Sequence, residues 1–567
     1  VPGSGLSAPW VDQFNISTSG AASFNVHPDA GTLNPLTSVC GQIKGKRKEP
    51  GEGGDSMDAP GPPGVAWQQD VFIAAGRGLE RYRPEFTFHG FRFMEITGLK
   101  EAPAPSACRG IPLHTDVSGA GSFSCSNDRL NRIQEMCRRT FLANLVSVQS
   151  DCPHRERFAY GGDIVVTSEA FLMNFDMAGF YAKTARDWAD SARPDGRFTD
   201  TSPFVGIDYC GVGWAMVHPL LLEQLHRHYG ASRLLQEQVP FAIRWLDGEA
   251  ARRKDGLVTS GLGDHEALAR VGGPVLTTPM FVDTARRVAR LARLTGREDD
   301  AARFEAMANE SSAAWADAYL EPDTGKVGGG TQSEQAFALG FGVVPTEARP
   351  AVFGRLVDGL AASDGPRLTT GIFGTRILLE ELSSHGRSEL SYALAARNTF
   401  PSWGWMLEND ATTLWEHWAG GANTHSHSHP MFGSVSGWVF RWLGGIQAAD
   451  DAVGFDRILI RPQIVSGLQS VTCSHRSIRG WIESNWFVTD SGARFEIVVP
   501  PDATALLELP VKAGDEITEG RRPVADVPGI EILRPGASVQ RFRVGSGHYR
   551  FTLHRGRDGG GVDQANR

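Results

Sequence analysis

The sequence predicts a multidomain chain in which an all-α domain is flanked by β-sandwich domains. Three observations lead to this prediction. The chain has 567 residues, which is too many for one hydrophobic core. Between about residues 126 and 445, apolar residues recur at helical spacing, whereas strand-like alternation occurs near both ends. Loops rich in Gly and Pro separate the helical segments.

Residues 1–125 are predicted to form a partial β-sandwich and a linker. Residues 86–96 alternate in the manner of a half-buried strand. Residues 49–64 are rich in Gly and Pro and indicate a long exposed loop. Because the strand pattern begins abruptly at Val1, we expect the earlier strands of this sandwich to lie outside the chain.

Residues 126–445 are predicted to form the all-α domain. Ser126-Asn127-Asp128 is a helix-capping cluster, and Asp163, which follows two glycines, is a second expected N-cap. About twelve helices are expected, beginning near residues 128, 163, 177, 211, 232, 276, 298, 331, 347, 371, 387 and 433. Such a set fits a bundle, a solenoid or an (α/α)6 toroid of six hairpins, and the lack of a fixed repeat disfavours the solenoid.

Residues 446–556 are predicted to form a C-terminal β-sandwich. Three short strand-like runs with turn signals between them support this, at residues 457–460, 494–500 and 549–553. The last residues, 557–567, are expected to be a disordered tail.

Composition excludes several classes of function. The net charge is -9 and no basic stripe is present, so nucleic acid is not an expected partner. No apolar run has transmembrane length, and no membrane partner is expected. The seven cysteines are scattered, which argues against a disulfide framework. No cofactor is predicted, and the oligomeric state is left open. We expect a soluble chain that is cytoplasmic, or periplasmic or secreted with its N-terminus missing.

A charged segment between two apolar stretches is the strongest candidate for a site. Residues 151–163 contain three carboxylates, two arginines, a histidine and a tyrosine. Pro153 and the glycine pair near its end disfavour regular structure. A solvated charged loop is the alternative interpretation. The buried flanks favour a pocket wall.

A second candidate segment, residues 401–418, holds four tryptophans around Glu408 and Glu416. Indole rings stack on the apolar faces of sugars, and a carboxyl group can act on a glycosidic oxygen. Cleavage of an acetal requires two carboxyl groups, one on each side of the bond. Glu156 and Glu416 fit that requirement, with Glu408 as a rival base. Trp403 and Trp405 are candidate sugar platforms.

Two further clusters are weaker. Histidines alternate at positions 425, 427 and 429, but no fourth ligand is evident, so no metal is predicted. The segments 210–214, which includes Trp214, and 263–266, which includes His265, are expected on loops between helices.

Several of these segments resemble the motifs of bacterial α-L-rhamnosidases of glycoside hydrolase family 78. They follow the same order as in the family, and the resemblance covers about residues 80 to 555. The segment at 151–163 is one residue shorter than the commonest family form and has Ala159-Tyr160 where Gly-Trp is usual. The matching segments are residues 89–98, 151–163, 368–375, 411–418, 429–435 and 460–463.

The resemblance implies an (α/α)6 catalytic domain flanked by β-sandwiches and an inverting mechanism that releases terminal α-L-rhamnose. It implies that Glu156 is the general acid and that Glu416 is the base that activates water. In inverting enzymes the two carboxyl groups lie about 6.5–9.5 Å apart. The implied rhamnose subsite consists of Asp151, Arg155, Asp163, Trp214 and His429. Tyr160 and His265 are added to these as substrate-binding candidates.

Two other functions fit the same residues. One is a lyase that removes rhamnose from glucuronate by β-elimination, with Tyr160 or a histidine as base. Its product would be an unsaturated uronate. The other is a carbohydrate-binding protein without catalytic activity, which the presence of both glutamates disfavours.

Overall fold

A computed structural model describes residues 9–16, 21–27, 69–76, 78–91, 93–99, 101–361, 365–419, 426–536 and 538–556. The chain divides into two compact units that are each assembled from segments distant in sequence. The first comprises Val1–Asp116, Met136–Tyr160 and Met406–Pro430, and the second comprises Val117–Glu135, Gly161–Trp405 and Met431–Arg567. The expected loop at 49–64 and the expected tail at 557–567 lie outside the described residues.

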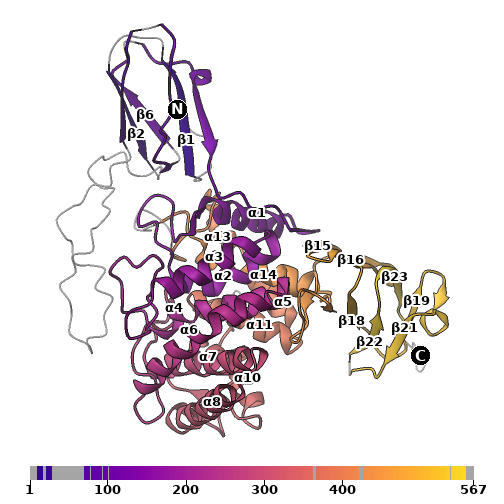
Figure 1. Cartoon of the computed structure of the whole chain (residues 1–567). Coiled ribbons are helices and arrows are strands. Elements are labelled where there is room, and N and C mark those ends of the chain that lie inside the picture. The colour runs from indigo at the N-terminus through magenta and orange to yellow at the C-terminus, as the bar shows by residue number, and fades with distance from the viewer. Residues whose placement is uncertain are drawn as a thin grey trace, which may run out of the picture. The chain divides into compact units, whose positions relative to one another are not determined.

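The N-terminal part of the first unit contains two small sheets (Figure 1). In one sheet β1 pairs with three strands, and in the other β2 lies between β3 and β6, all antiparallel. The bounds of the first sheet are β1 (Pro9–Ile16), β4 (Glu80–Tyr82), β5 (His89–Gly90) and β7 (Cys108–Pro112). Those of the second are β2 (Ala21–His27), β3 (Gln69–Ile73) and β6 (Phe93–Thr97). A short helix η2 (Pro105–Ala107) precedes β7.

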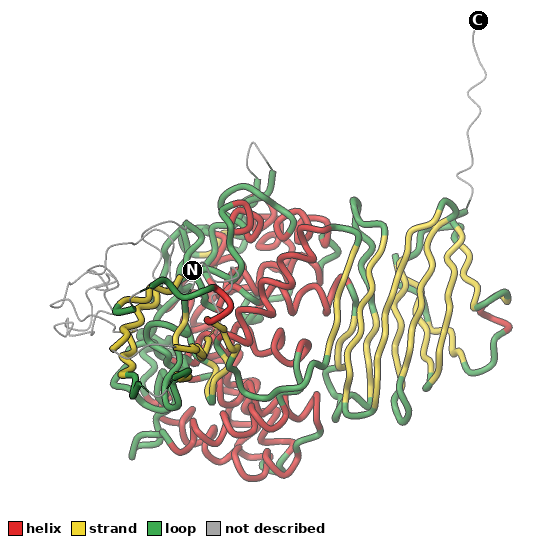
Figure 2. The backbone as a smooth tube through the Cα atoms, turned by 90° about the horizontal axis from the view of Figure 1, so that it is seen from above, coloured by secondary structure: helices red, strands yellow, loops and turns green. Residues whose placement is uncertain are grey.

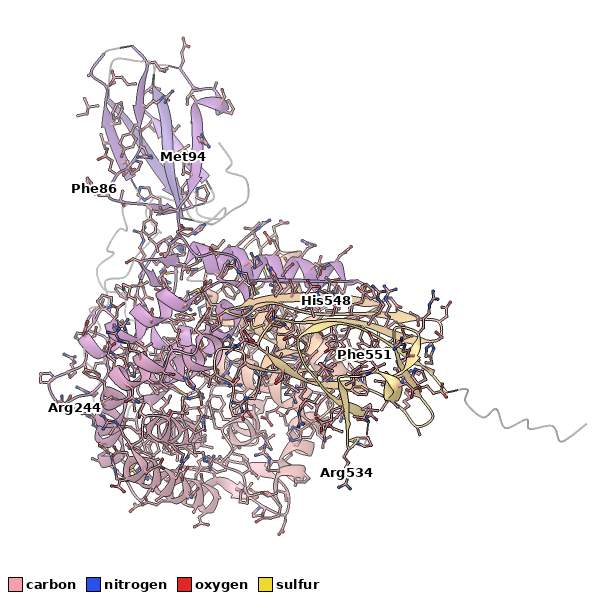
Figure 3. All side chains as sticks on the ribbon, turned by 45° about the vertical axis from the view of Figure 1, so that its right-hand side comes forward. Phe86, Met94, Arg244, Arg534, His548 and Phe551 are labelled. Carbon is pink, nitrogen blue, oxygen red and sulfur yellow. The ribbon has the colours of Figure 1, made fainter. Side chains whose placement is uncertain are left out.

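The single strand predicted at 86–96 is therefore only partly correct. Its residues are divided between β5 and β6, which belong to different sheets. Phe86, the first residue of that run, is 99% exposed and projects from the fold (Figure 3). Later in the first unit, β9 (Leu145–Val146) and β10 (Val148–Gln149) form a hairpin.

Helices make up most of the regular structure between residues 128 and 443 (Figures 1 and 2). Every predicted helix start lies within two residues of an observed one. The sequence missed α13 and the break between α4 and α5. The helices are α1 (Asp128–Ala143, shared between the units), α2 (Gly161–Asn174), α3 (Ala178–Asp190), α4 (Val212–Ala215), α5 (Val217–Tyr229), α6 (Ser232–Ala251), α7 (Pro274–Leu294), α8 (Glu298–Tyr319), α9 (Gln332–Gly340), α10 (Arg349–Asp358), α11 (Ile372–Ser384), α12 (Ser388–Ala395), α13 (Trp403–Glu408, also shared), η3 (Pro430–Phe432), α14 (Ser434–Trp438) and η4 (Val439–Leu443, a π-helix). A hairpin of β11 (Leu320–Glu321) and β12 (Lys326–Val327) follows α8.

Two helix starts show how local sequence and packing set the boundaries. At α9, Thr331 and Glu334 form a capping box, in which each side chain accepts the other residue's backbone N–H. At α2, the helix begins at Gly161, so Asp163 lies inside the first turn and its prediction as N-cap was wrong. A Cβ on Gly162 would lie 2.4 Å from the Trp214 ring. The glycines thus permit close packing of the helix and do not interrupt it.

Two sheets follow the helices in the second unit (Figure 2). The five-stranded sheet has the order β13-β14-β18-β22-β21, with β14 and β18 parallel. Its strands are β13 (Ile446–Ala448), β14 (Arg457–Ile460), β18 (Thr504–Pro510), β21 (Ile530–Leu533) and β22 (Val539–Val544). The seven-stranded sheet has the order β20-β19-β23-β17-β16-β15-β8. Its strands are β8 (Gly121–Cys125), β15 (Ser470–Ser477), β16 (Gly480–Thr489), β17 (Gly492–Val499), β19 (Glu516–Glu519), β20 (Arg522–Pro523) and β23 (Gly547–His554), with η5 (Val524–Asp526) after β20.

The three strands predicted in this region are observed as β14, β17 and β23. Strand β8 changes the expected division of the chain. It ends at Cys125, within the predicted N-terminal part, yet it pairs with β15 in the C-terminal sheet. A boundary at residue 125 therefore separates β8 from the sheet to which it belongs. In the described part of the chain, no helix combines the length and apolar character needed to cross a membrane.

Three histidines are buried without charge in the second unit, and they make its stability sensitive to pH. Burial lowers the pKa of His218 to about 4, of His228 to about 3 and of His475 to about 4. The rings of His228 and Phe455 meet edge to face with centroids 4.9 Å apart. An unfolded histidine titrates near about 6.5, so the unfolded chain binds protons first as the pH falls. The stability that the neutral histidines contribute is therefore complete above about pH 6.5. It is lost as the pH falls from there toward their pKa values in the folded chain.

We predict that His228→Leu reduces this acid sensitivity. Between pH 7.5 and 5.0, a histidine with a folded pKa of about 3 costs ~2 kcal/mol of stability. Urea unfolding gives the free energy of unfolding at each pH. The decrease in this free energy from pH 7.5 to pH 5.0 should be about 2 kcal/mol smaller in the variant than in the wild-type chain. The exposed His548 (Figure 3) provides a control, since His548→Leu should leave the pH dependence of the free energy of unfolding unchanged. An unaltered decrease in His228→Leu would contradict the prediction.

Candidate active site

Residues 151–160 form a closed loop in the first unit. The backbone N–H of Asp151 donates to the carbonyl of Phe158 at 3.0 Å. The N–H of Phe158 donates back to Oδ1 of the Asp151 side chain at 2.7 Å. Asp151 is 1% exposed, so its carboxylate is used to close the loop. This pairing keeps the irregular charged segment in one conformation, as a pocket wall requires.

Arg157 fastens the same loop to the N-terminal strands of its unit. Its Nε donates to the carbonyl of Pro153 at 2.9 Å, and its Nη2 donates to the carbonyl of Phe88 at 2.8 Å. The guanidinium also lies 4.2 Å from the centroid of the Phe88 ring. The two segments are so close at Gly90 that a Cβ atom on this residue would lie 3.0 Å from the Cβ of His154. Arg157 was not among the predicted site residues, and it acts here as a positioning residue.

Residues 413–416, at the end of the second candidate segment, run beside residues 426–429. The N–H of Glu416 donates to the carbonyl of Ser426, and the N–H of His429 donates to the carbonyl of Leu414, both at 2.9 Å. The hydroxyl of Thr413 adds a third bond, to the carbonyl of His427 at 2.6 Å. These bonds bring Glu416 and His429 together although thirteen positions separate them in the chain.

The C-terminal half of α1 holds both stretches, 413–416 and 426–429, through hydrogen bonds within the first unit. The hydroxyl of Thr140 accepts the N–H of Leu414 at 2.8 Å. The amide of Asn144 donates to the carbonyl of Ser428 at 3.2 Å. The two side chains are fully buried, so their polar groups are committed to these contacts.

Arg155 joins the two segments. Its Nη1 lies 3.7 Å from Oε2 of Glu416, whose side chain is 7% exposed. Nδ1 of His429 lies 3.8 Å from the same oxygen. On the other segment, the hydroxyl of Tyr160 donates to Oε1 of Glu156 at 3.4 Å. Glu156 is half-buried. The structure thus gathers Arg155, Glu156, Tyr160, Glu416 and His429 into one unit.

These contacts bear on the alternatives raised by the sequence. The arginines beside Glu156 are engaged elsewhere, Arg155 with Glu416 and Arg157 with backbone oxygens. Glu416 is buried and does not lie on an exposed helix face. Glu408, the rival base, is exposed at the end of α13. The pair Glu156 and Glu416 is therefore the better-placed pair of carboxyl groups.

The other predicted site residues belong to the second unit. Asp163 is 4% exposed in the first turn of α2. Trp214 is 2% exposed, packs against Gly162 and meets the ring of His265 edge-on, with centroids 5.9 Å apart. His265 keeps 24% of its side chain exposed. This unit therefore places a buried carboxylate, an indole and an imidazole on neighbouring elements.

The two candidate tryptophans of α13 have different surroundings. Trp403 is 0% exposed, and its Nε1 donates to the carbonyl of Phe432 at 2.9 Å. It is packed in the core, and its role as a sugar platform stays a prediction. Trp405 is only half-buried and meets Phe400 edge to face, with centroids 6.3 Å apart. Phe400 is itself 36% exposed, so Trp405 remains a candidate platform.

Asp264, next to His265, has a structural role that the sequence did not reveal. Burial raises its pKa, and hydrogen bonds to its carboxylate oppose that effect. The carboxylate holds the N-terminus of α11, where unpaired N–H groups favour a negative charge. The donors are Ser333 Oγ (2.6 Å) and the N–H groups of Gly371 (2.7 Å), Phe373 (3.0 Å) and Gly374 (2.9 Å).

The arrangement suits acid–base chemistry. One carboxyl group, Glu156, is partly open and receives a hydroxyl donor, while the other, Glu416, is buried beside a guanidinium and an imidazole. In the part of the chain that the structure describes, no group of three or more His, Cys, Asp or Glu side chains is arranged to hold a metal ion. His425, one of the three alternating histidines, lies outside the described residues.

Comparison with known families gives three matches along the chain. Residues 118–443, more than half of it, match the bacterial alpha-L-rhamnosidase 6 hairpin glycosidase domain. Residues 445–523 match the bacterial alpha-L-rhamnosidase C-terminal domain. Residues 64–114 match the bacterial alpha-L-rhamnosidase concanavalin-like domain.

Individual relatives agree with these matches. An alpha-L-rhamnosidase of Streptomyces avermitilis is 32% identical over 85% of this chain and 47% of its own length. One of Alteromonas sp. is 27% identical over 78% of this chain and 50% of its own length. The chain therefore spans about half the length of these curated relatives.

Solved structures give the same result for the fold. The alpha-L-rhamnosidase of Dictyoglumus thermophilum has a TM-score of 0.87 and 27% identity, and the match covers 97% of this chain and 61% of that one. The S. avermitilis enzyme, solved in complex with L-rhamnose, has a TM-score of 0.83 and 28% identity, over 96% of this chain and 51% of that one.

Proposed function

The chain belongs to the bacterial α-L-rhamnosidase family, and from that premise we propose that it hydrolyses terminal α-L-rhamnosides. The observation that carries the proposal is the contact between Arg155, which directly precedes Glu156, and Glu416 at 3.7 Å. It brings the two candidate carboxyl groups into one neighbourhood from distant parts of the chain. The solved relative that holds L-rhamnose supports the choice of sugar.

In the proposed reaction Glu156 is the general acid. Its proton moves to the glycosidic oxygen as the bond between that oxygen and the anomeric carbon breaks. The hydroxyl of Tyr160, 3.4 Å from Oε1, orients the carboxyl group and keeps it in one rotamer. The partial exposure of Glu156 leaves room for the leaving group.

Glu416 is the general base. It takes a proton from a water molecule as the water oxygen bonds to the anomeric carbon from the face opposite the leaving group. The configuration is therefore inverted. The guanidinium of Arg155 and the imidazole of His429 flank the carboxylate and fix its position. After one turnover Glu416 returns its proton to solvent, and Glu156 is protonated again.

The remaining predicted residues are proposed to bind the substrate. They are Asp151, Arg155 and His429 in the first unit, and Asp163, Trp214, His265, Trp403 and Trp405 in the second. The proposal includes the finer architecture, in which the helices close into an (α/α)6 toroid and the flanking sheets pack as β-sandwiches. The proposed substrates are rhamnosylated glycosides, oligosaccharides or polysaccharides.

Hydrolysis of 4-nitrophenyl α-L-rhamnoside, followed by proton NMR within the first minutes, tests this function. We expect release of rhamnose with the β anomer appearing first and mutarotating afterwards. The α anomer as first product would contradict inversion. An unsaturated uronate that absorbs in the near ultraviolet, formed from a rhamnosyl glucuronate, would identify the lyase alternative instead.

A further inference from the structure

A cavity of about 330 Å³ lies on the outer face of the five-stranded sheet, where η4 adjoins it. Strand register places Gln447, Leu459, Leu506 and Arg543 in one row across β13, β14, β18 and β22. Leu459 and Leu506 are half-buried in the middle of that row, while their neighbours along each strand point into the core. The cavity thus has an apolar floor formed by two leucines.

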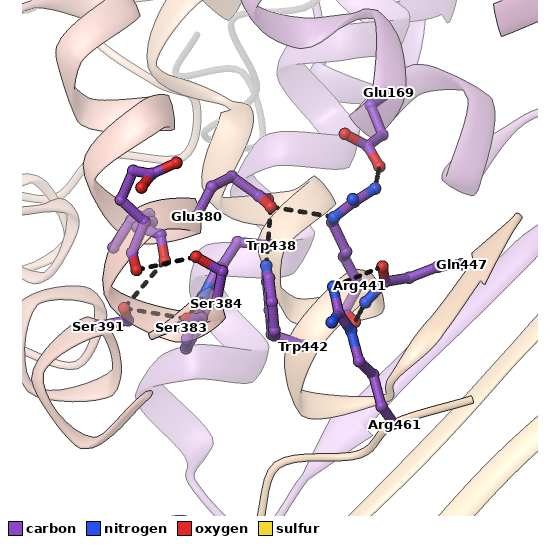
Figure 4. A network of polar contacts seen from close by, with 12 residues as sticks. Glu169, Glu380, Ser383, Ser384, Ser391, Trp438, Arg441, Trp442, Gln447 and Arg461 are labelled. Atoms are coloured by element: carbon purple, nitrogen blue, oxygen red, sulfur yellow. Dashed lines mark hydrogen bonds and ion pairs between the residues drawn. The ribbon is translucent and has the colours of Figure 1, made fainter. Parts of the chain in front are cut away.

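Arginines outnumber carboxylates among the lining residues. Four arginines line the cavity, against one carboxylate, Asp450. Three of the four have carboxylate partners of their own. Arg441 lies between Glu169 and Glu380 (Figure 4), Arg457 pairs with Asp451, and Arg543 pairs with Glu531.

Arg461 is the exception. Its Nη2 donates to Oε1 of Gln447 at 3.1 Å (Figure 4), and its guanidinium lies 4.3 Å from the centroid of the Trp442 ring. Its buried Nε has no hydrogen-bond partner among the described residues. Within the ranges that the structure describes, no carboxylate lies within ion-pairing distance of Arg461. Burial and the positive charge of Arg441 lower the pKa of Arg461, while the carboxylates of Glu508, Glu380 and Asp450 act in the opposite direction.

A planar guanidinium stacked on an indole is suited to bind a carboxylate through two parallel hydrogen bonds. Leucine side chains beside it offer contact to the apolar face of a ring. We propose that this cavity binds a sugar that carries a carboxylate, such as a glucuronate residue. Arg461 takes the carboxylate, and Leu459 and Leu506 contact the pyranose ring. All these residues lie in the second unit, and none belongs to the proposed rhamnose subsite.

Titration calorimetry of the whole chain with free glucuronate, glucose and inorganic sulfate tests this site. We expect saturable binding of glucuronate that weakens with added salt, and at least tenfold weaker binding of glucose and of sulfate. Glucose that binds as tightly as glucuronate would overturn the role of the carboxylate. Sulfate that displaces glucuronate at equal concentration would overturn the role of the sugar ring.

Arg461→Met keeps the apolar stem over Trp442 and removes the guanidinium, so glucuronate binding should fall at least tenfold. Thr504→Glu adds a negative charge at the exposed rim without removing a core contact, and it should weaken binding to a similar degree. The control is Arg534→Gln at an arginine that projects from the same domain (Figure 3) and lies outside the cavity. Undiminished binding in both Arg461→Met and Thr504→Glu would refute the proposal. Because binding is measured without turnover, failure here is distinct from failure of the hydrolase assignment.

Discussion

Glu156→Gln is expected to lower kcat/KM by about 10²–10⁴-fold on a rhamnoside whose leaving group is an alkyl alcohol, the range typical of a lost general acid. The isosteric amide keeps the shape of the side chain and can still accept the hydroxyl proton of Tyr160, now 3.4 Å from Oε1. It cannot protonate the departing oxygen. A nitrophenolate departs without that proton, so the loss on 4-nitrophenyl rhamnoside should be much smaller.

Comparison of the two substrates is therefore the informative measurement. Kinetics of the wild-type chain and of Glu156→Gln on both rhamnosides give the ratio of the two losses. Glu408→Gln is the matched control, since Glu408 is an exposed glutamate at the end of α13 and should retain full activity on both. Equal losses on the two substrates would point to a role for Glu156 in binding, and unchanged activity would remove it from the mechanism.

The helices were predicted well because their signal is local. Apolar spacing and capping residues, such as Ser126 and Asn127 before α1, lie within one turn of the boundary that they define. Predictions failed where a boundary depends on packing between distant segments. Asp163 was expected to cap α2, but Trp214 packs against Gly161 and Gly162, and the helix extends through them.

The residues proposed for the site could be selected from the sequence, but the contacts between them could not. The chemistry of acetal cleavage and the motif resemblance both selected Glu156 and Glu416. Nothing local indicates that Arg155 reaches Glu416 or that Arg157 binds the carbonyl of Phe88, since each partner is far away in the chain. Trp403 and Trp405 likewise have similar local sequence. Only the tertiary fold buries Trp403 and leaves Trp405 partly open.

Glu416→Gln is expected to lower kcat by about 10²–10⁴-fold, with little change in KM, because the base acts on water and not on the sugar. Unlike the loss in Glu156→Gln, this loss should be similar for nitrophenyl and alkyl rhamnosides, since activation of water is needed whichever group leaves. Initial rates on both substrates measure this. A marked dependence on the leaving group would assign Glu416 the role of acid instead.

Glu416→Ala extends the test to stereochemistry. Removing the side chain opens a space beside the guanidinium of Arg155 and the imidazole of His429, which lie 3.7 Å and 3.8 Å from Oε2 in the wild-type chain. These groups should attract a small anion such as azide, which needs no base to attack. We expect azide to restore turnover of 4-nitrophenyl α-L-rhamnoside and to yield β-L-rhamnosyl azide, identified by NMR. Glu156→Ala keeps Glu416 in that space and should give no β-azide. An α-azide from Glu416→Ala would mean that the attack comes from the face of the leaving group, and the assignment of Glu416 as the base of an inverting reaction would have to be abandoned.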